Sequence, residues 1–490
     1  MFGGFCMKRT VAFLLSIFFS CSFLLGFVGC KKEENKRHRY EITAEYMPDT
    51  QTVTGTVKLT WQNHTDTGVD ALKFNLWANA YREDAAYQPV SAACSSSAYY
   101  VGRNYGGMDV TSAHGGKSWE IVGEDANILC VYMEDVVYPG EEVTVDLGFS
   151  TRLAKVNHRT GVTKHAVNIV NFFPILCAYG KEGFVENPYY SVGDPFRSDT
   201  ANYRVTFTAP KEYGVAFSGS VIEQKTLGSK NEYTVSLTNA RDFAIVMSEE
   251  FKTERCKVGN TDLVYYYYDD ETPAAHLAAA KESFSYYSSA FGEYPYETYS
   301  VVQTGFCHGG MEYPGLVMIG DRLQKEDFLY TIAHETAHQW WYAAVGSDQV
   351  NEAWQDEGLA EYSTALFFEN HPAYGITERA LCEKATENYR SYYDVYGRVF
   401  GTADTRMSRP LNEFISEYEY ASVSYDKGLI LFHTLRASIG EKRFLNGLKR
   451  YYKQYCFKNA RPADLIGCFE KTGVDIAGLF SSFLEGKAVI

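Results

Sequence analysis

The feature that most constrains this chain is an apolar segment that contains two histidines four positions apart. Between Tyr330 and Trp341, apolar residues recur at helical spacing around the pentapeptide His-Glu-Thr-Ala-His, which begins at His334. On a helix, residues four apart stand one above the other, so His334 and His338 can reach a single ion while Glu335 projects beside it. The pentapeptide alone is a weak signal, because the same pattern arises by chance in unrelated proteins.

A glutamate further along the chain strengthens the prediction of a metal site. Glu357 lies in a second helix-like segment, separated from His338 by eighteen residues that include a turn at Gly346. Two histidines, one carboxylate and an open fourth position are typical of a catalytic zinc site, whereas a structural site closes all four positions with protein ligands. We therefore predict one Zn²⁺ per chain, bound by His334, His338 and Glu357. Zinc in such a site lowers the pKa of a bound water toward about 7, and Glu335 would accept its proton.

Two more blocks flank this site in the sequence. The first is Gly309, Gly310, Met311 and Glu312, and the second is Ser424, Tyr425, Asp426, Lys427 and Gly428. With the His-Glu-x-x-His pattern between them, the blocks stand in an order that resembles the aminopeptidase N family of gluzincin zinc metallopeptidases. The resemblance covers roughly residues 40–490, and its motifs are highly specific in combination.

The resemblance implies a role for each block. Glu335 is expected to act as general base and then general acid, and the phenol of Tyr425 to hydrogen-bond the oxyanion. Glu312 is expected to bind the free amino group of a peptide, while the backbone of residues 309–311 lines the extended substrate. The protein is thus expected to be an aminopeptidase that removes N-terminal residues from peptides by metal-activated water. No acidic residue of the N-terminal part can be assigned as a second anchor for the amine.

Alternatives remain open at this point. A zinc endopeptidase is the alternative among enzymes, because Tyr313 stands where the family has asparagine. A non-catalytic surface binding lipoprotein is the alternative of a different class. Glu361, one helical turn beyond Glu357, either orients a metal ligand or is an exposed helix carboxylate. The family's long C-terminal helical domain is expected to be missing.

The order of the hydrophobic patterns predicts an α+β protein. Between residues 40 and 250, short segments such as 52–61 alternate apolar and polar residues, with many β-branched and aromatic side chains. This pattern predicts antiparallel strands with one buried face. Helical, alanine-rich stretches such as 274–291 follow. We expect an N-terminal antiparallel β-rich domain at 40–250 and a mainly helical catalytic domain at 251–490, which the resemblance identifies as thermolysin-like.

The first thirty residues have the pattern of a secretion signal. Lys8 and Arg9 precede an apolar run from Val11 to Val28, and Cys30 follows a glycine. This arrangement resembles a bacterial lipoprotein signal, in which the cysteine carries the lipid. An uncleaved anchor helix is the alternative, because the apolar run is long enough to span a bilayer. Residues 1–30 are therefore expected to be a signal peptide or lipoprotein anchor that places an exported protein at a membrane, outside the cytoplasm.

Charge and cysteine content restrict the partners. The formal net charge is −15, and no basic stripe is present, which argues against nucleic acid, because a phosphate-binding surface needs clustered lysine and arginine. The expected partners are a peptide substrate and a membrane, reached through the N-terminal lipid or anchor helix. Eight cysteines follow Cys30 without CxxC spacing, so their pairing stays open.

Overall fold

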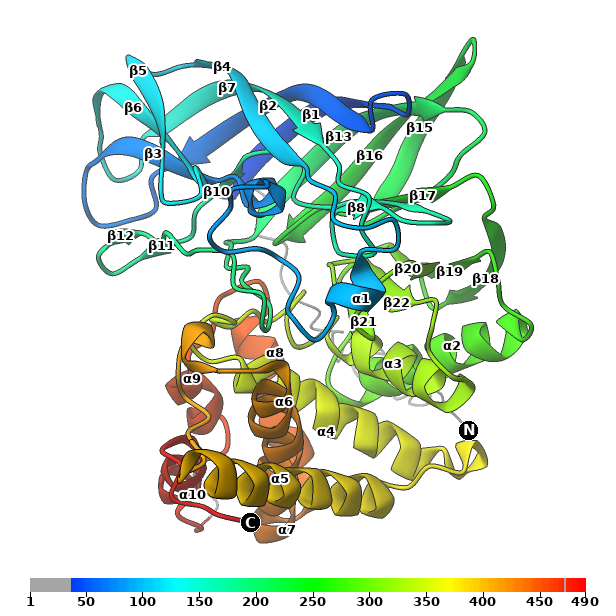
Figure 1. Ribbon diagram of the computed structural model, residues 1–490. Coiled ribbons are helices and arrows are strands. Elements are labelled where there is room, and N and C mark those ends of the chain that lie inside the picture. The colour runs from blue at the N-terminus through cyan, green and yellow to red at the C-terminus, as the bar shows by residue number, and fades with distance from the viewer. Residues whose placement is uncertain (1–36, 471–472) are drawn as a thin grey trace, which may run out of the picture.

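The computed structural model describes residues 37–470 and 473–490, and it separates strands from helices along the chain. In Figure 1, the strands of residues 38–248 lie together at one end of the molecule and the helices from α4 onward lie at the other. A smaller sheet and the helices α2 and α3 lie between them at one side. A continuous cluster of buried apolar side chains runs through both parts. The α+β architecture predicted from the sequence is confirmed.

The largest sheet has seven strands, in the order β15-β16-β13-β1-β2-β7-β4. Its strands, in chain order, are β1 (His38–Met47), β2 (Thr52–Gln62), β4 (Gly107–His114), β7 (Glu142–Arg152), β13 (Ala201–Pro210), β15 (Ser220–Leu227) and β16 (Lys230–Ala240). All neighbours are antiparallel except β1 and β13, which pair in parallel. Residues alternate between buried and accessible along β1 and β13, so one face of the sheet is covered.

Shorter sheets cover the rest of the β-rich part. One sheet contains β3 (Val69–Asn75), β5 (Ser118–Val122), β6 (Ile128–Val137) and β10 (Ile175–Leu176). A second contains β8 (Gly161–Val162), β9 (Val167–Ile169), β14 (Gly214–Phe217) and β17 (Ile245–Ser248). The third is the pair of β11 (Tyr179–Gly180) and β12 (Gly183–Phe184). Two short helices interrupt the strands, η1 (Trp77–Tyr81) and α1 (Ser95–Ala98). In Figure 1, α1 lies on the side of the β-rich part that faces β21 and β22.

A five-stranded sheet supports the second part, in the order β18-β19-β20-β22-β21. Its strands are β18 (Lys252–Val258), β19 (Thr261–Tyr267), β20 (Thr298–Thr304), β21 (Gly310–Met311) and β22 (Leu316–Gly320). The three strands β19, β20 and β22 are parallel, whereas β21 is an antiparallel edge strand. The free edge of β21 leaves backbone groups available to an added strand.

Helix α2 (Pro273–Ala290) lies between β19 and β20, and helices make up most of the chain after residue 320. The later helices are α3 (Lys325–Ala337), α4 (Trp354–Asn370), η2 (Pro372–Tyr374), α5 (Glu378–Phe400), η3 (Leu411–Glu413), α6 (Glu417–Tyr420), a π-helix (Ala421–Asp426), α7 (Lys427–Ile439), α8 (Glu441–Tyr455), α9 (Pro462–Gly467) and α10 (Ile476–Leu484). Helices α4 and α7 approach closely at two glycines. A Cβ atom added to Gly428 would lie 2.7 Å from the Cα atom of Gly358. No larger residue fits there, so the glycine pair sets the distance between the two helices.

The predicted signal segment 1–30 and its cysteine, Cys30, lie outside the described residues. Within the described ranges, none of the helices combines the length and the apolar character needed to cross a bilayer.

Candidate active site

The two histidines of the pentapeptide lie at the C-terminal end of α3. The sequence predicts a helix up to Trp341, but α3 ends at Ala337 and His338 is its C-cap. His338 keeps helical backbone angles, with φ −62° and ψ −16°, and its N–H donates to the carbonyl oxygen of His334 at 3.2 Å. Both imidazoles therefore still share one face, as predicted for residues four apart.

The side chain of Glu357, from the first turn of α4, meets these imidazoles. Nε2 of His338 lies 3.0 Å from Nε2 of His334 and 3.2 Å from Oε2 of Glu357. Nε2 of His334 lies 3.5 Å from the same carboxylate oxygen. All three residues are buried. Ligands about 2.0–2.2 Å from a tetrahedral zinc lie about 3.3–3.6 Å apart. The three distances of 3.0, 3.2 and 3.5 Å approach this spacing, and the two shorter ones need to widen by a few tenths of an ångström to hold one zinc ion.

The other ring nitrogens show how these imidazoles are oriented. Nδ1 of His338 donates to the carbonyl oxygen of Trp341 at 2.9 Å, and Nδ1 of His334 lies 3.1 Å from Oε1 of Glu361. Both partners are acceptors, so both contacts favour the tautomer with hydrogen on Nδ1, although only the contact of His338 has hydrogen-bond geometry. In the neutral imidazoles, the Nε2 lone pairs then point toward each other and toward a carboxylate, an arrangement that a cation stabilises. The donor set therefore fits Zn²⁺, and Glu361 orients a ligand rather than facing solvent.

Glu335 lies beside this ligand set under the edge strand β21. Its side chain is buried, and burial raises the pKa of the Glu335 carboxyl to about 7. A Cβ atom added to Gly310 would lie 2.3 Å from Oε1 of Glu335. The missing side chain at position 310 therefore lets the strand approach the carboxylate directly. At Gly309 the nearest atom to an added Cβ is 3.7 Å away, so this glycine is not sterically required.

Glu312 follows β21 and lies on the same side as the metal ligands. One oxygen atom of its carboxylate lies within 4.8 Å of a ring nitrogen of His338 and of a carboxylate oxygen of Asp356. The carboxylate is buried and accepts a hydrogen bond of 3.0 Å from Nε2 of Gln349. Burial, together with the nearby Asp194, raises the pKa of Glu312 well above its usual range. A cationic group placed here would offset this cost, because the site is rich in carboxylates.

Tyr425 reaches the site from the π-helix that precedes α7. Its hydroxyl donates a hydrogen bond of 2.5 Å to Oε1 of Glu357, and the hydroxyl of Tyr420 lies 3.4 Å from the same oxygen. The Tyr425 ring stacks on the His334 ring with a centroid distance of 5.9 Å. π-Helical turns are rare and often occur at functional sites, and this one turns Tyr425 toward the metal ligands.

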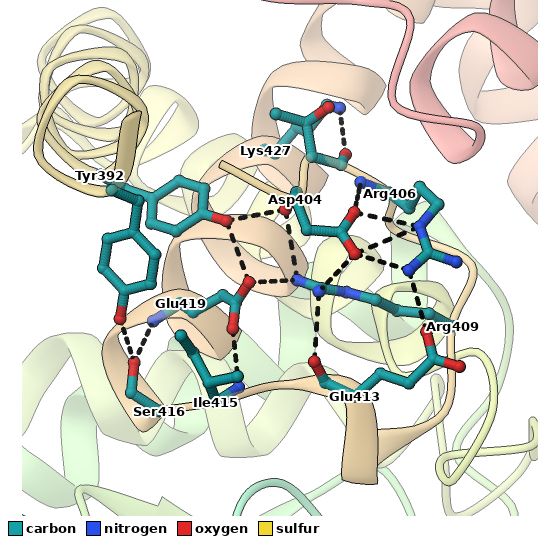
Figure 2. Close-up of polar contacts among 11 residues, drawn as sticks. Tyr392, Asp404, Arg406, Arg409, Glu413, Ile415, Ser416, Glu419 and Lys427 are labelled. Atoms are coloured by element: carbon teal, nitrogen blue, oxygen red, sulfur yellow. Dashed lines mark hydrogen bonds and ion pairs between the residues drawn. The ribbon is translucent and has the colours of Figure 1, made fainter. Parts of the chain in front are cut away.

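A buried ion-pair network fixes the segment that carries Tyr425 (Figure 2). Nη2 of Arg409 lies 3.1 Å from Oε1 of Glu419 in α6, and the other oxygen of Glu419 accepts a 2.7 Å hydrogen bond from the backbone of Ile415. At the other end, Nζ of Lys427 donates to the carbonyl oxygen of Thr405 at 2.7 Å. The π-helix is thus held on both sides by charged groups with buried partners.

One acidic residue of the site was not found from the sequence. Asp194 belongs to the β-rich part, forms a buried ion pair with Arg159, and contributes to the raised pKa of Glu312 and Tyr425. Arg159 also donates to the sulfur of Met311 at 3.1 Å. The surrounding Gly193-Asp194-Pro195 is an ordinary loop sequence, so no local signal could have identified Asp194.

Comparison with known proteins agrees with this geometry. Residues 275–483 match the Peptidase family M1 domain. Aminopeptidase N of Streptomyces lividans is 26% identical over 246 residues, which are 44% of this chain and 27% of that protein. Endoplasmic reticulum aminopeptidase 2 of Homo sapiens is 27% identical over 139 residues, which are 27% of this chain and 13% of that protein. This chain thus spans about a quarter or less of the length of these relatives.

Solved structures show the same fold over nearly the whole chain. The M1 zinc metallopeptidase from Deinococcus radiodurans superposes with a TM-score of 0.63 at 18% identity, covering 92% of this chain and 94% of that one. Another structure of a Deinococcus radiodurans M1 zinc metallopeptidase, described as bound to a Tyr-Ser-Ala substrate, superposes with a TM-score of 0.62 at 17% identity, covering 92% of this chain and 94% of that one.

The two-histidine, one-glutamate site has the ligand set of the gluzincin class of metallopeptidases. Residues 275–483 match the Peptidase family M1 domain, and the matched relatives and structures together support an aminopeptidase N-like family for this part of the chain.

Proposed function

We propose that this protein is a zinc aminopeptidase that removes residues from the free N-termini of peptides, with one catalytic zinc per chain. The observation that carries the proposal is the position of Glu312, a buried carboxylate within 4.8 Å of a His338 ring nitrogen. An amine bound there would lie one residue from a scissile carbonyl at the metal. A buried carboxylate at this point favours a substrate that brings a free, cationic amine over an internal peptide segment that brings none.

The residues of the site divide the chemistry among them. His334, His338 and Glu357 would hold zinc, which would supply Lewis-acid chemistry and lower the pKa of a bound water toward about 7. Glu335 accepts a proton and later delivers it to the leaving amine, since it is buried beside the ligands. The backbone of β21 pairs with the extended peptide along its free edge. To stabilise the oxyanion, the Tyr425 hydroxyl exchanges its present acceptor, Glu357, for the substrate oxygen.

The first experiment separates catalysis from metal binding. In Glu335→Gln the three ligands remain, so zinc content should be unchanged while kcat falls by about 10²–10⁴-fold, the range typical of a lost general base. Glu326→Gln, in the exposed first turn of the same helix, is the matched control and should keep full activity. Undiminished turnover in Glu335→Gln would remove Glu335 from its assigned role.

The second experiment tests the aminopeptidase assignment itself. Wild-type protein should cleave a peptide with a free N-terminus and leave its N-acetylated counterpart intact. In Glu312→Gln, KM for the free peptide should rise, because the amine loses its ionic partner. Equal cleavage of the free and acetylated peptides by the wild type would favour the endopeptidase instead.

We also propose that the protein is exported and tethered to a membrane through a lipid on Cys30. This proposal rests on the order of charged, apolar and cysteine residues in the first thirty positions. A clickable fatty-acid probe should label the wild type in its producing cells, and Cys30→Ser should lose the label and move to the soluble fraction. An unlabelled protein that stays with the membrane would instead indicate an uncleaved anchor helix.

A further inference from the structure

Four side chains of metal-ligand type meet outside the active site. Sγ of Cys94 lies 3.6 Å from Nδ1 of His308 and 3.6 Å from Oε2 of Glu417. Ligand atoms of Cys94, Cys307 and His308 all lie within 4.8 Å of one another. Nδ1 of His308 is 3.9 Å from the second oxygen of Glu417. Two thiols and an imidazole therefore surround one point, and the Glu417 carboxylate lies beside Cys94 and His308.

These residues come from three separate segments of the chain. Cys94 immediately precedes α1 in the β-rich part, and Cys307 and His308 lie in the loop between β20 and β21. Glu417 is the first residue of α6. Cys94 is 213 residues from Cys307 and 323 from Glu417. Their meeting is thus a product of the tertiary fold, at the place where α1 faces β21 in Figure 1.

The distances among Cys94, His308 and Glu417 are close to those of a tetrahedral zinc site. With Zn–S bonds of about 2.3 Å and Zn–N or Zn–O bonds of about 2.0–2.1 Å, tetrahedral ligands lie about 3.4 Å apart for two light atoms and about 3.6 Å apart for sulfur and nitrogen or oxygen. The two measured distances from Cys94 are both 3.6 Å. The 3.9 Å between His308 and Glu417 needs a shift of only a few tenths of an ångström.

Hydrogen bonding alone leaves the cluster unsatisfied. Two acceptor oxygens lie near Sγ of Cys94, the carbonyl oxygen of Cys307 at 3.8 Å and Oε2 of Glu417 at 3.6 Å, and Nδ1 of His308 lies at 3.6 Å. One thiol hydrogen can serve only one of the two oxygens well. Oε1 of Glu417 and Nε2 of His308 are moreover buried without a hydrogen-bond partner. A cation at the centre would satisfy the thiolates, Nδ1 and the carboxylate together.

We propose that Cys94, Cys307, His308 and Glu417 bind a second Zn²⁺. Four protein ligands close the coordination sphere, which is typical of a structural site rather than a catalytic one. The ion joins the β-rich part to the loop directly before Gly309 and to α6, which leads into the π-helix of Tyr425. It therefore braces both the substrate-binding strand and the segment of the catalytic tyrosine. The protein then holds two zinc ions per chain, one more than the sequence predicts.

Cobalt substitution tests this site apart from the active site. Co²⁺ bound to thiolates gives a sulfur-to-metal charge-transfer absorption, and the active-site ligands contain no sulfur. Wild-type protein loaded with Co²⁺ should show this band with two metal ions per chain. His334→Ala should keep the band and lose one ion, whereas His308→Ala and Cys94→Ser should lose the band or weaken it strongly and lose the other ion. Cys256→Ser, a cysteine of β18 outside the cluster, is the matched control and should behave as wild type.

The competing arrangement is a disulfide between Cys94 and Cys307, both of which are free thiols in this structure. Protein isolated without reductant and denatured with a thiol-alkylating reagent distinguishes the two. Alkylation of both residues, together with two zinc ions per chain, supports the metal site. An unalkylated Cys94–Cys307 pair overturns it, and so does a wild type with one zinc ion and no charge-transfer band. A wild type that shows the charge-transfer band but cleaves no peptide would refute the proposed function and leave this site standing.

Discussion

The Tyr425 hydroxyl donates a hydrogen bond of 2.5 Å to Oε1 of Glu357, while Oε2 of Glu357 faces the two histidines. One carboxylate thus connects the metal position with the residue proposed to stabilise the oxyanion. The close contact between Gly358 of α4 and Gly428 of α7 brings tyrosine and carboxylate together. Gly358 directly follows Glu357, and Gly428 lies three residues after Tyr425. The distance between the two helices therefore sets the distance between tyrosine and metal.

Removing the hydroxyl of Tyr425 tests its role in stabilising the oxyanion. In Tyr425→Phe, kcat should fall by about 10²–10³-fold, the usual effect of losing one oxyanion donor, with KM little changed. Steady-state kinetics on a free peptide, with zinc content measured in parallel, provide the check. The hydroxyl also contacts Glu357, a predicted zinc ligand. A fall in kcat therefore reports the oxyanion role only if the zinc content of the variant is unchanged. An unchanged kcat in the zinc-loaded variant contradicts the assignment.

The two glycines before Glu312 should differ sharply in their tolerance of alanine. Gly310→Ala places a Cβ atom 2.3 Å from the Glu335 carboxylate, so either the strand or the base must move, and kcat should fall at least tenfold. Gly309→Ala meets nothing closer than 3.7 Å and is the matched control. Circular dichroism should show both variants folded. Equal activity of the two variants would mean that β21 is not held against Glu335.

Glu361 should affect zinc affinity more than the chemical step. Its carboxylate lies 3.1 Å from Nδ1 of His334, and loss of such a partner typically weakens metal binding by 10–100-fold. Competition of Glu361→Gln with a chelator should show this weakening, while zinc-saturated kcat changes less. Glu369→Gln, on the same helix but paired with Arg436, should bind zinc like the wild type. Identical zinc affinity in Glu361→Gln would assign the carboxylate to the surface instead.

The buried and exposed arginines of Figure 2 should contribute unequally to stability. The Arg409 side chain is 1% exposed and pairs with Glu419, which is 3% exposed. Arg409→Met leaves that carboxylate without its partner and should lower the free energy of unfolding by about 3–5 kcal/mol. Arg406→Met removes two ion pairs, with Asp404 and Glu413, from a side chain that is 49% exposed and should cost less than about 1 kcal/mol for each pair. Urea unfolding of both variants gives the comparison, and equal losses would contradict it.

Asp242 should make the protein less stable as pH rises. Burial raises its pKa to about 7, although it accepts hydrogen bonds from the Phe243 backbone and from Asn171. In the unfolded chain an aspartate has a pKa near 3.9, so the folded state binds the proton more tightly. The contribution of Asp242 to stability is therefore lost between about pH 4 and pH 7, in total on the order of 4 kcal/mol.

The corresponding experiment compares the wild type with Asp242→Asn, which cannot ionise. The variant should gain stability relative to the wild type by about 2–3 kcal/mol between pH 5 and pH 8, measured by urea unfolding. Other titrating groups are common to both proteins and cancel in the difference. A difference that is constant with pH would show that Asp242 titrates near its ordinary pKa.

The sequence by itself was enough to predict whatever depends on local periodicity. Strand β2 contains the alternating segment 52–61, helix α2 covers most of 274–291, and the histidines of α3 share one face. Glu312 and Tyr425 could be named only through a family resemblance, because they lie in other segments. The end of α3 was misplaced, since helical periodicity continues into residues whose backbone turns away.

Only the tertiary structure could bring together groups that no sequence spacing relates. Asp194 beside Glu312, Glu361 beside His334, and the meeting of Cys94 with Cys307, His308 and Glu417 all depend on how separate segments pack. Backbone geometry dictates neighbours within a helix or strand over a few residues. Contacts across hundreds of residues depend instead on the close packing of the entire core, which a short pattern does not encode.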